Sequence, residues 1–236
     1  LKAAVVDWLE DSTSAEAKYT HIGRWDTSNV TDMYELFQDD DTFNENIGAW
    51  DVSPVTDMSY AFSVAETFDQ DIGPWDTSKV ASMQQTFSYA AAFDQDIGDW
   101  DVSQVTDMSE LFKGINFNAP IDQWDTSQVT DMRAMFLFAT AFNQPLAFNT
   151  SKVTTMYGMF NLAIAFNQPL TFDTSQVTNM RYMFYGATAF NQPRTFDTME
   201  VEDMAYMFGD ATAFNQPLTF DTQSVDDMSY MFAGAT

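Results

Sequence analysis

The sequence repeats itself every 24 to 25 residues. Nine copies share the pattern of an aromatic residue, then Val, then Met three residues after the Val and Phe four residues after that Met; the first copy has Trp25, Val30, Met33 and Phe37. The aromatic position is filled by Trp25, Trp50, Trp75, Trp100, Trp124, Phe148, Phe172, Phe196 and Phe220. A unit this short cannot bury its own apolar side chains, so stacked units must bury them together. The spacing predicts a solenoid whose aromatic and Met columns form the core.

Each unit divides into three parts. Leu-Thr-Phe at 170–172 alternates apolar and polar residues, as a half-buried strand does. The following Asp-Thr-Ser is typical of a turn. The apolar residues of Val-Thr-Asp-Met-x-x-Met-Phe fall at helical spacing, which predicts a helix of about one to two turns. Thr31 and its equivalents are expected to be the N-cap, with Asp32 at the positive end of the helix dipole.

The period shortens along the chain. The loop after Phe112 loses one residue, and Ile97-x-x-Trp100 becomes Leu146-x-Phe148 from the sixth copy onward. The smaller aromatic arrives with the lost residue, so we expect a tighter coil, and a bulge or bend at the extra residue of the longer copies.

The chain is expected to have two parts. Residues 1–21 precede the repeat, and Leu1, Ala4, Val5, Trp8 and Leu9 are spaced as on an amphipathic helix, which predicts a cap over the open core at the first copy. Residues 22–236 form the repeat. Because the sequence stops at 233–236, where earlier copies continue into Ala-Phe-Asn, we expect the natural protein to continue there or this end to dock on a partner.

Charge and composition exclude several classes of function. The net charge of −26 repels nucleic acid and anionic lipid. The absence of Cys excludes disulfides and thiolate metal sites. Apolar runs are too short for insertion in a membrane. His21 is the only histidine and no nucleophile or phosphate-loop motif is present, so we expect no enzyme.

The motif Trp-Asp-Thr-Ser-x-Val-Thr-Asp-Met-x-x-Met-Phe, followed by Ala-Thr-Ala-Phe-Asn-Gln, resembles the BspA-like surface-protein repeats, also called DUF285 repeats, of mycoplasma lipoproteins, other bacteria and unicellular algae. The opening Leu-Lys-Ala-Ala-Val-Val-Asp-Trp-Leu resembles the lead-in to such arrays. Asn149, Met199 and Gln223 depart from the turn pattern. The resemblance implies a leucine-rich-repeat-like solenoid, a cell-surface or extracellular location, and adhesion or protein interaction without catalytic residues.

Together these features predict an α/β fold, a right-handed leucine-rich-repeat-like solenoid of about nine coils, each with a short strand, a turn and a short helix, behind an N-terminal capping helix. The predicted function is non-catalytic binding to a protein or cell-surface partner. The alternative is a self-assembling component of a cell coat or filament.

Two columns of Asp are the strongest candidate for chemistry. The first contains Asp26, Asp51, Asp76, Asp101, Asp125, Asp173, Asp197 and Asp221. The second contains Asp32, Asp57, Asp107, Asp131, Asp203 and Asp227. Rows of carboxylates repel one another unless they are capped or bridged, and calcium suits such rows. Calcium-dependent binding is therefore a lower alternative; the favoured interpretation is that the first column makes turns and the second caps helices, with no cofactor.

Three further columns have weaker functional claims. The first is expected to bond its own bend and the next coil from inside: Asn44, Asp69, Asp94, Asn118, Asn143, Asn167, Asn191 and Asn215. The second is a single Thr row, of a kind that can bind ice or crystal surfaces, but it sits in a turn: Thr27, Val52, Thr77, Val102, Thr126, Thr150, Thr174, Thr198 and Thr222. The third is a Tyr stripe that offers a contact surface: Tyr60, Tyr157, Tyr182, Tyr206 and Tyr230.

Overall fold

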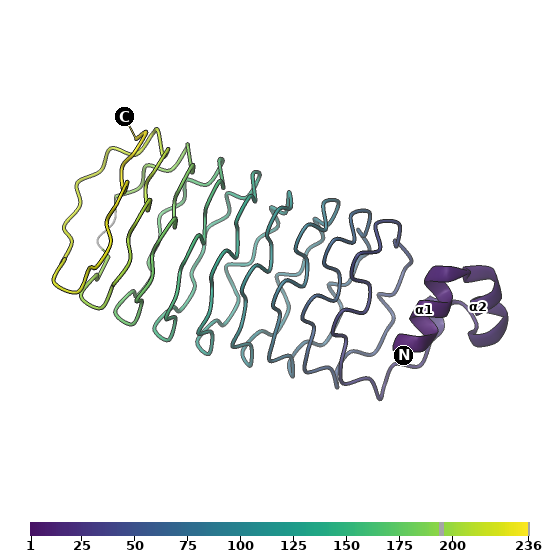
Figure 1. The fold of residues 1–236 in the computed structure, drawn as a ribbon. Helices are drawn as coiled ribbons and strands as arrows, with labels where there is room; N and C mark the ends of the chain where they lie inside the picture. Colours follow the sequence, from purple (N-terminus) through teal and green to yellow (C-terminus); the bar gives the residue numbers. More distant parts are fainter. Residues whose placement is uncertain (194–195, 236) are drawn as a thin grey trace.

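The computed structural model describes residues 1–193 and 196–235. Helices α1 (Lys2–Glu10) and α2 (Ser12–Tyr19) are followed by a short 3-10 helix, η1 (Ile22–Arg24). The repeat then winds into coils that stack side by side along one axis, with the helices at one end and the C-terminus at the other (Figure 1). The expected continuation or docking of the C-terminal end concerns Thr236, which lies outside the described residues.

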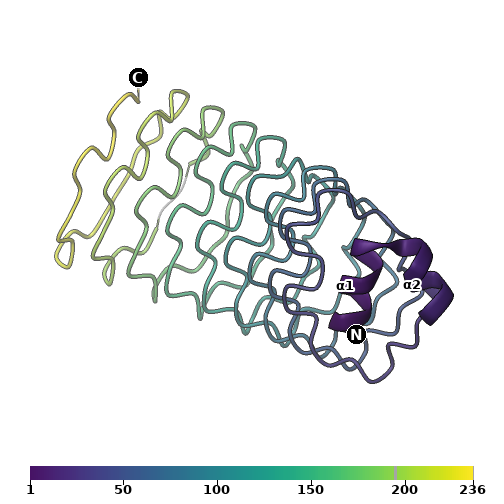
Figure 2. The ribbon, with the colours of Figure 1, turned by 45° about the vertical axis from the view of Figure 1, so that its right-hand side comes forward.

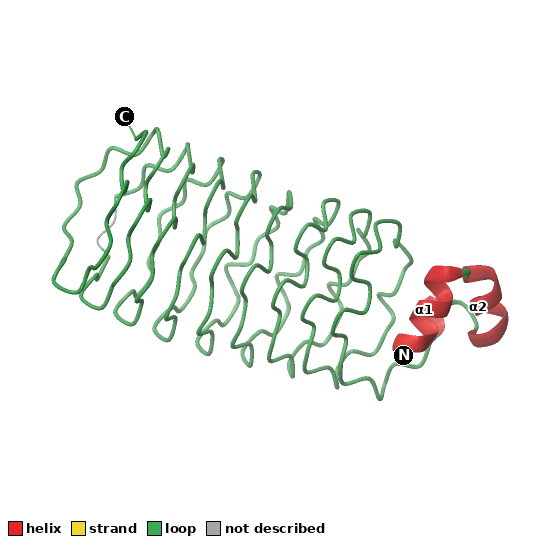
Figure 3. Ribbon diagram, viewed as in Figure 1, coloured by secondary structure: helices red, strands yellow, loops and turns green. Residues whose placement is uncertain are grey.

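The predicted α/β fold, with a strand and a helix in each coil, is wrong. Within the described ranges the helices are confined to residues 2–24, and the coils are drawn as loops and turns (Figure 3). Neighbouring coils touch through isolated parallel bridges such as Asp32 with Asp57 and Asp107 with Asp131, one residue wide in each coil. A further single bridge joins Leu146 to Leu170, where the strand was expected. The structure therefore gives no support to a leucine-rich-repeat architecture.

Consecutive β-turns replace the expected helix. The N–H groups of Met33 and Glu35 donate to the carbonyls of Asp57 and Ser59 in the next coil, at 2.9 and 3.1 Å, while the N–H of the following residue, Leu36, donates to Met33 O of its own coil at 3.1 Å. A helix would instead send each N–H to the carbonyl four residues earlier. Because alternate amides bond the neighbouring coil, the backbone turns every few residues and cannot continue as a helix.

This path requires left-handed backbone at two positions in every coil, four residues apart. Glu35 and Asp39 have φ of 57° and 61° in the first coil, and Tyr60 and Val64 have 59° and 61° in the second. Glycine fills a few of these positions, as at Gly114 and Gly158, but most carry side chains that cost about 1–2 kcal/mol each in this region. Hydrogen bonds and burial between coils must offset that cost.

The aromatic and Met columns form the core, as predicted. In each of the first eight coils the Phe of the Met-x-x-x-Phe pattern stacks on a second Phe, with centroids 3.9 Å apart for Phe37 and Phe43 and 4.1 Å for Phe136 and Phe142. The next coil adds a parallel ring, Phe62 lying 5.4 Å from Phe37. These rings are fully buried in the middle of the stack. Figure 2 shows the coils enclosing this interior behind the N-terminal helices.

A β-turn explains the longer period of the early coils. The N–H of Trp75 donates to Ile72 O at 3.1 Å, and the indole N–H donates to Ile47 O of the preceding coil at 3.3 Å. Gly73 lies inside this turn, where a Cβ would come within 2.6 Å of the Asp96 carbonyl in the following coil. The expected bulge is therefore a tight turn that requires glycine.

The same turn explains the shorter late coils. From the sixth copy on, Leu146-Ala-Phe148 has lost both the turn residue and the indole that bonded the previous coil. The fifth copy already carries Asp122 in place of glycine, and the coil that follows it is the first without the turn. Glycine is therefore needed in this turn only where the next coil contains the same turn.

Two helices, rather than one, lie against the first coil. Asp11 ends α1 and caps α2 by accepting the Ser14 N–H at 3.1 Å. Asp7 ties the helices together through Lys18 Nζ and the Tyr19 hydroxyl, each at 2.8 Å. The buried ring of Trp8 meets Trp25 edge-on at 5.9 Å, so α1 covers the aromatic core at this end.

Candidate interaction surface

The first Asp column makes turns, as the favoured interpretation predicted. Asp125 Oδ1 accepts the Ser127 N–H at 3.0 Å, and Asp173 Oδ1 accepts the Ser175 N–H at 3.0 Å. Asn149 keeps the same bond to Ser151, at 3.1 Å. Hydrogen bonds from the Ser hydroxyl and N–H lower the pKa of Asp125 and of its equivalent Asp76, because both bonds favour the charged carboxylate.

The second Asp column also caps turns, not helices. Asp57 Oδ1 accepts the Ser59 N–H at 2.8 Å, and Asp107 and Asp203 make the equivalent bonds at 2.8 and 2.9 Å. Thr31, expected as the N-cap, instead accepts from Thr56 of the next coil through its carbonyl. Burial raises the pKa of Asp131. Among the described residues no group of three or more His, Asp or Glu side chains is placed to hold a metal ion.

The Asn column joins coils, as expected, but at the surface rather than inside. Asn143 Oδ1 accepts the N–H of Asn167, and Asn167 Oδ1 accepts that of Asn191, at 2.9 and 3.0 Å. Gln168 Nε2 adds a bond to the Asn143 carbonyl at 2.9 Å. The side chains are half-buried or exposed. Each Asn therefore extends a polar ladder that fixes the register of the stack.

Most side chains of the Thr column are buried and cannot contact a flat external surface. Thr126, Thr150 and Thr174 are almost fully buried, and their hydroxyls donate to the carbonyl that opens the next coil's turn, at 2.8 to 3.0 Å. The hydroxyls of these three Thr residues are used within the fold, so this part of the row offers no crystal-binding face.

The Tyr stripe contains an ordered aromatic stack, which we call the tyrosine patch: Tyr182, Tyr185, Tyr206 and Tyr230. The rings of Tyr182 and Tyr206 are parallel with centroids 4.9 Å apart, and those of Tyr206 and Tyr230 repeat the same 4.9 Å step. Tyr185 meets Tyr182 edge-on at 5.6 Å. Tyr230 in the last coil is 64% exposed and so is Phe232 beneath it, at 48%, whereas Phe184 and Phe208 beneath Tyr182 and Tyr206 are buried. The one-per-coil spacing brings these rings into register.

Arg181 lies over the tyrosine patch. Its Cζ is 4.9 Å from the centroid of Tyr182 and 5.8 Å from that of Tyr206. Its Nη1 is 3.4 Å from Asp203 Oδ2 and 3.5 Å from Asp227 Oδ2. Neither Arg181 nor Tyr185 was among the residues predicted from the repeat. The sequence could have indicated Arg181, because it is one of only nine cations and directly precedes the Tyr column.

A second hydrogen-bonded carboxylate borders the patch. Tyr185 is bonded to Asp210, and this bond, with a smaller contribution from burial, raises the pKa of the Tyr185 hydroxyl. Tyr157, another member of the predicted stripe, meets Tyr182 edge-on at 6.0 Å and extends the aromatic surface by one coil. Tyr60 lies apart, against Tyr34 in the first two coils. The stripe is thus divided into two clusters.

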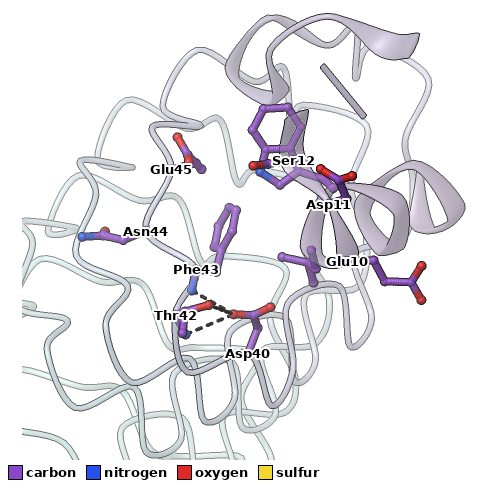
Figure 4. Close-up of a pocket in the computed structure, with 10 residues that line it drawn as sticks. Glu10, Asp11, Ser12, Asp40, Thr42, Phe43, Asn44 and Glu45 are labelled. Atoms are coloured by element: carbon purple, nitrogen blue, oxygen red, sulfur yellow. Dashed lines mark hydrogen bonds between the residues drawn. The ribbon is translucent and has the colours of Figure 1, made fainter. Parts of the chain in front are cut away.

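A separate hollow of about 340 Å³ lies between the N-terminal helices and the first coil (Figure 4). Trp8 and Phe43 are among its lining residues, with Glu10, Asp11 and Asp40. Asp40 accepts the N–H groups of Thr42 and Phe43, at 3.0 and 2.9 Å. Because Asp11 caps α2 in the same way, these carboxylates are already used by the fold.

The histidine nearby also has a structural role. His21 Nδ1 accepts the Gly23 N–H at 3.2 Å, and Nε2 is 3.6 Å from Glu45. Trp8 packs edge-on against its ring at 5.2 Å. The ring therefore supports the junction between helices and coils.

The sequence model of one family, described as "Mycoplasma protein of unknown function, DUF285", matches residues 9–118, 107–196 and 170–236. These matches span nearly the whole chain. The chain belongs to the DUF285 family. No curated protein and no protein of solved structure matches it. Within the described part of this DUF285 chain, no helix has the length and apolar character needed to cross a membrane.

Proposed function

We propose that this chain is a non-catalytic binding scaffold of the cell surface or extracellular space, and that it holds a protein partner at the tyrosine patch. One observation carries the proposal: three parallel Tyr rings are held one coil apart at the surface of a repeat whose main Phe column is buried from Phe37 to Phe208. Tyr and Arg are enriched at the centres of protein interfaces.

Rigidity supports a binding role for the patch. The Tyr182 and Tyr206 backbones have φ of 57° and 58°, and their N–H groups donate to Ala205 O and Ser229 O of the next coil, each at 3.0 Å. Side chains on such a frame lose little freedom when a partner binds. The surface location draws its support from the resemblance to BspA-like repeats.

Peptide display tests the proposal. Peptides selected from a random library on the intact chain are expected to bind at least about fivefold more weakly to the Tyr206→Asn, Tyr230→Asn double variant. Asn tolerates left-handed backbone, so folding is preserved. Phe138→Asn is the matched control, because Phe138 is also an exposed aromatic residue at positive φ but lies outside the patch.

Selected peptides that bind both variants equally would overturn the role of the patch. The alternative function, self-assembly, is tested on the same sample by sedimentation velocity. Oligomers that grow with concentration would support it, whereas a constant monomer favours partner binding.

A further inference from the structure

We infer that the fifth and sixth coils carry a docking face for a second copy of this chain, and that two copies pair through this face about a two-fold axis. The inference goes beyond the proposed function and does not depend on the tyrosine patch. It follows from the part of the chain that lacks carboxylates and exposes apolar side chains instead.

Residues 132–172, which we call the carboxylate-free belt, contain no Asp or Glu. The 131 residues before the belt hold 26 of the 35 acidic residues, and the 64 residues after it hold the other nine. The belt has two cations, Arg133 and Lys152. Its coils lie inside the stack, between further coils on both sides (Figure 1). The belt is therefore an interior section of low charge in a strongly acidic solenoid.

Folding does not account for the missing charges. In the sixth coil Asn149 stands in the first Asp column and still accepts the N–H of Ser151, at 3.1 Å. Thr155 stands in the second Asp column and still accepts the N–H of Tyr157, at 3.3 Å. Because a neutral acceptor also closes these turns, the loss of both charges in one coil points to a role outside the coil.

Two positions that hold acids in other coils hold exposed apolar side chains in the belt. The position of Asp39 in the first coil is taken by Phe138 in the fifth and Leu162 in the sixth. The position of Glu66 in the second coil is taken by Ile164 in the sixth. Phe138 and Ile164 are 41% and 45% exposed. The belt thus combines missing carboxylates with exposed apolar groups.

The apolar side chains form one surface across neighbouring coils. The Phe138 N–H donates to Asn161 O of the next coil at 2.8 Å, and the Leu162 N–H donates to Tyr185 O at 2.7 Å. Phe138 and Leu162 therefore stand side by side in one column, with bonded coils beyond them. Leu162 lies over Gly186, because a Cβ on Gly186 would collide with Leu162 Cδ2. Contiguous exposed apolar surface marks interaction sites.

The charge pattern favours an acidic partner for this belt. The acidic coils on either side would hold a basic molecule more strongly than the belt would. An acidic molecule, in contrast, can approach the chain closely only where the carboxylates are absent, since juxtaposed like charges oppose binding. This chain is itself such a molecule, with a net charge of −26.

The belt also meets the requirement for pairing with itself. In a two-fold pair the same surface of each copy contacts the other copy. An acidic surface would then bring like charges together, whereas an apolar surface of low charge complements itself. Such a contact closes after two copies, so it yields a pair and not a filament.

Sedimentation equilibrium of the intact chain over a range of concentrations tests the inference. The mass is expected to rise toward that of two copies and no further. Leu162→Asp and Ile164→Glu are each expected to weaken the pair about tenfold or more, since each places a charge against the other copy. The repeat already uses these residues at the same positions, as Asp210 and Glu66, so the fold is kept.

Matched controls separate a local contact from general repulsion. Val64→Asp and Ala91→Glu place the same residues at the same positions of the second and third coils, outside the belt. Val64 matches Leu162 closely, because both are half-buried and have φ of 61° and 57°. Both controls add the same charge to the chain and are expected to weaken the pair less than twofold at about 0.15 M salt.

The sign of the salt effect distinguishes apolar pairing from charge pairing. Raising NaCl from about 0.05 to 0.5 M should strengthen the pair about threefold or more, because salt screens the repulsion between the acidic coils of the two copies. A belt that instead bound the acidic coils of another copy through its cations would release that copy as salt rises.

Equal effects of the belt variants and their controls, or a pair that weakens as salt rises, would overturn the inference. A chain that stays monomeric at every concentration would overturn it and leave the proposed function intact. A mass that grows beyond two copies would overturn it in favour of open self-assembly.

Discussion

At the scale of single residues, carboxylates and left-handed positions shape each coil. Asp173 accepts the Ser175 N–H and thereby closes a turn, and Asn149 does the same for Ser151 without a charge. The acceptor oxygen, and not the negative charge, is what the turn needs. Rows of Asp in this chain are therefore explained by local hydrogen bonding before any ion is invoked.

Replacing Asp125 and Asp173 by Asn should make the protein less sensitive to acid. The pKa of each carboxyl is lowered in the folded state by the bonds from Ser, so each stabilises the fold above the unfolded value near pH 3.9 and loses that effect as pH falls through the folded pKa. Thermal melts should show a smaller drop in Tm below about pH 4 for the double variant.

All other carboxylates are the same in the variant and the wild type. The difference in Tm between the two proteins therefore reports only the substituted sites. At pH 7 the Asn variant should melt slightly below the wild type, because it keeps the acceptor but loses the charge that strengthens the bond, whereas the matching Ala variants should lose more, about 2–4 °C per site, since the acceptor is gone. Asn and Ala variants with equal Tm at pH 7 would contradict the turn-closing role.

Val64 is an unfavourable side chain at a left-handed position, because it is β-branched and has φ of 61°. Val64→Gly is expected to raise stability by about 1 kcal/mol, measured by chemical denaturation. Because the Val64 side chain is half-buried, the packing that is lost with it limits that gain. The control is Glu66→Gly, an exposed neighbour without positive φ, which should lower stability by about 0.5–1 kcal/mol. Destabilisation by both variants would show that packing of Val64 outweighs its backbone strain.

At the scale of the structural element, each coil is shaped by its neighbours. The Ile-Gly-x-Trp turn brings Gly73 against the Asp96 carbonyl of the next coil, while Trp75 reaches back to Ile47. A coil that contains this turn therefore packs against a neighbouring coil that contains the same turn. The loss of the turn residue, with Phe in place of Trp, begins after the fifth copy and persists to the last copy, as that matching requires.

Gly73→Ala is expected to destabilise the protein by about 1–3 kcal/mol, because a Cβ cannot lie 2.6 Å from a backbone carbonyl without separating the coils. Asp122→Ala occupies the equivalent place where the following coil has no turn, and should change stability by less than about 0.5 kcal/mol. Urea denaturation of both variants measures the difference. A similar loss in both would mean that glycine serves only the local turn.

At the scale of the whole molecule, charge opposes a stack held by apolar columns. The chain brings 35 carboxylates together with nine cations, so salt should stabilise the fold by screening their repulsion. Because the carboxylates of both Asp columns accept backbone N–H groups, this stabilisation needs no specific ion.

Raising NaCl from about 0.05 to 0.5 M should therefore raise Tm, and millimolar calcium should raise it no more than equal magnesium. A calcium-specific increase in Tm, reversed by chelator, would instead show ions bound to the folded state. Melts in the three salts decide between screening and the calcium alternative.

The repeat itself predicted several features correctly. Val, Met and Phe in register must share one environment in every coil, so their burial follows from the period, as do the turns at the first Asp column. The stacking of Tyr182, Tyr206 and Tyr230 follows from the same register, because equivalent side chains in successive coils are neighbours.

The backbone path was decided by tertiary structure. Apolar residues at i, i+3 and i+4 fit both a short helix and a run of turns, and the choice depends on whether Glu35 N–H bonds its own coil or Ser59 of the next. Glycines at 114, 158 and 186 were the available sign of positive φ. Sequence alone could determine which side chains are buried together; only the neighbouring coil, which supplies alternate hydrogen-bond partners, could determine the backbone conformation and the position of Arg181 over the tyrosine patch.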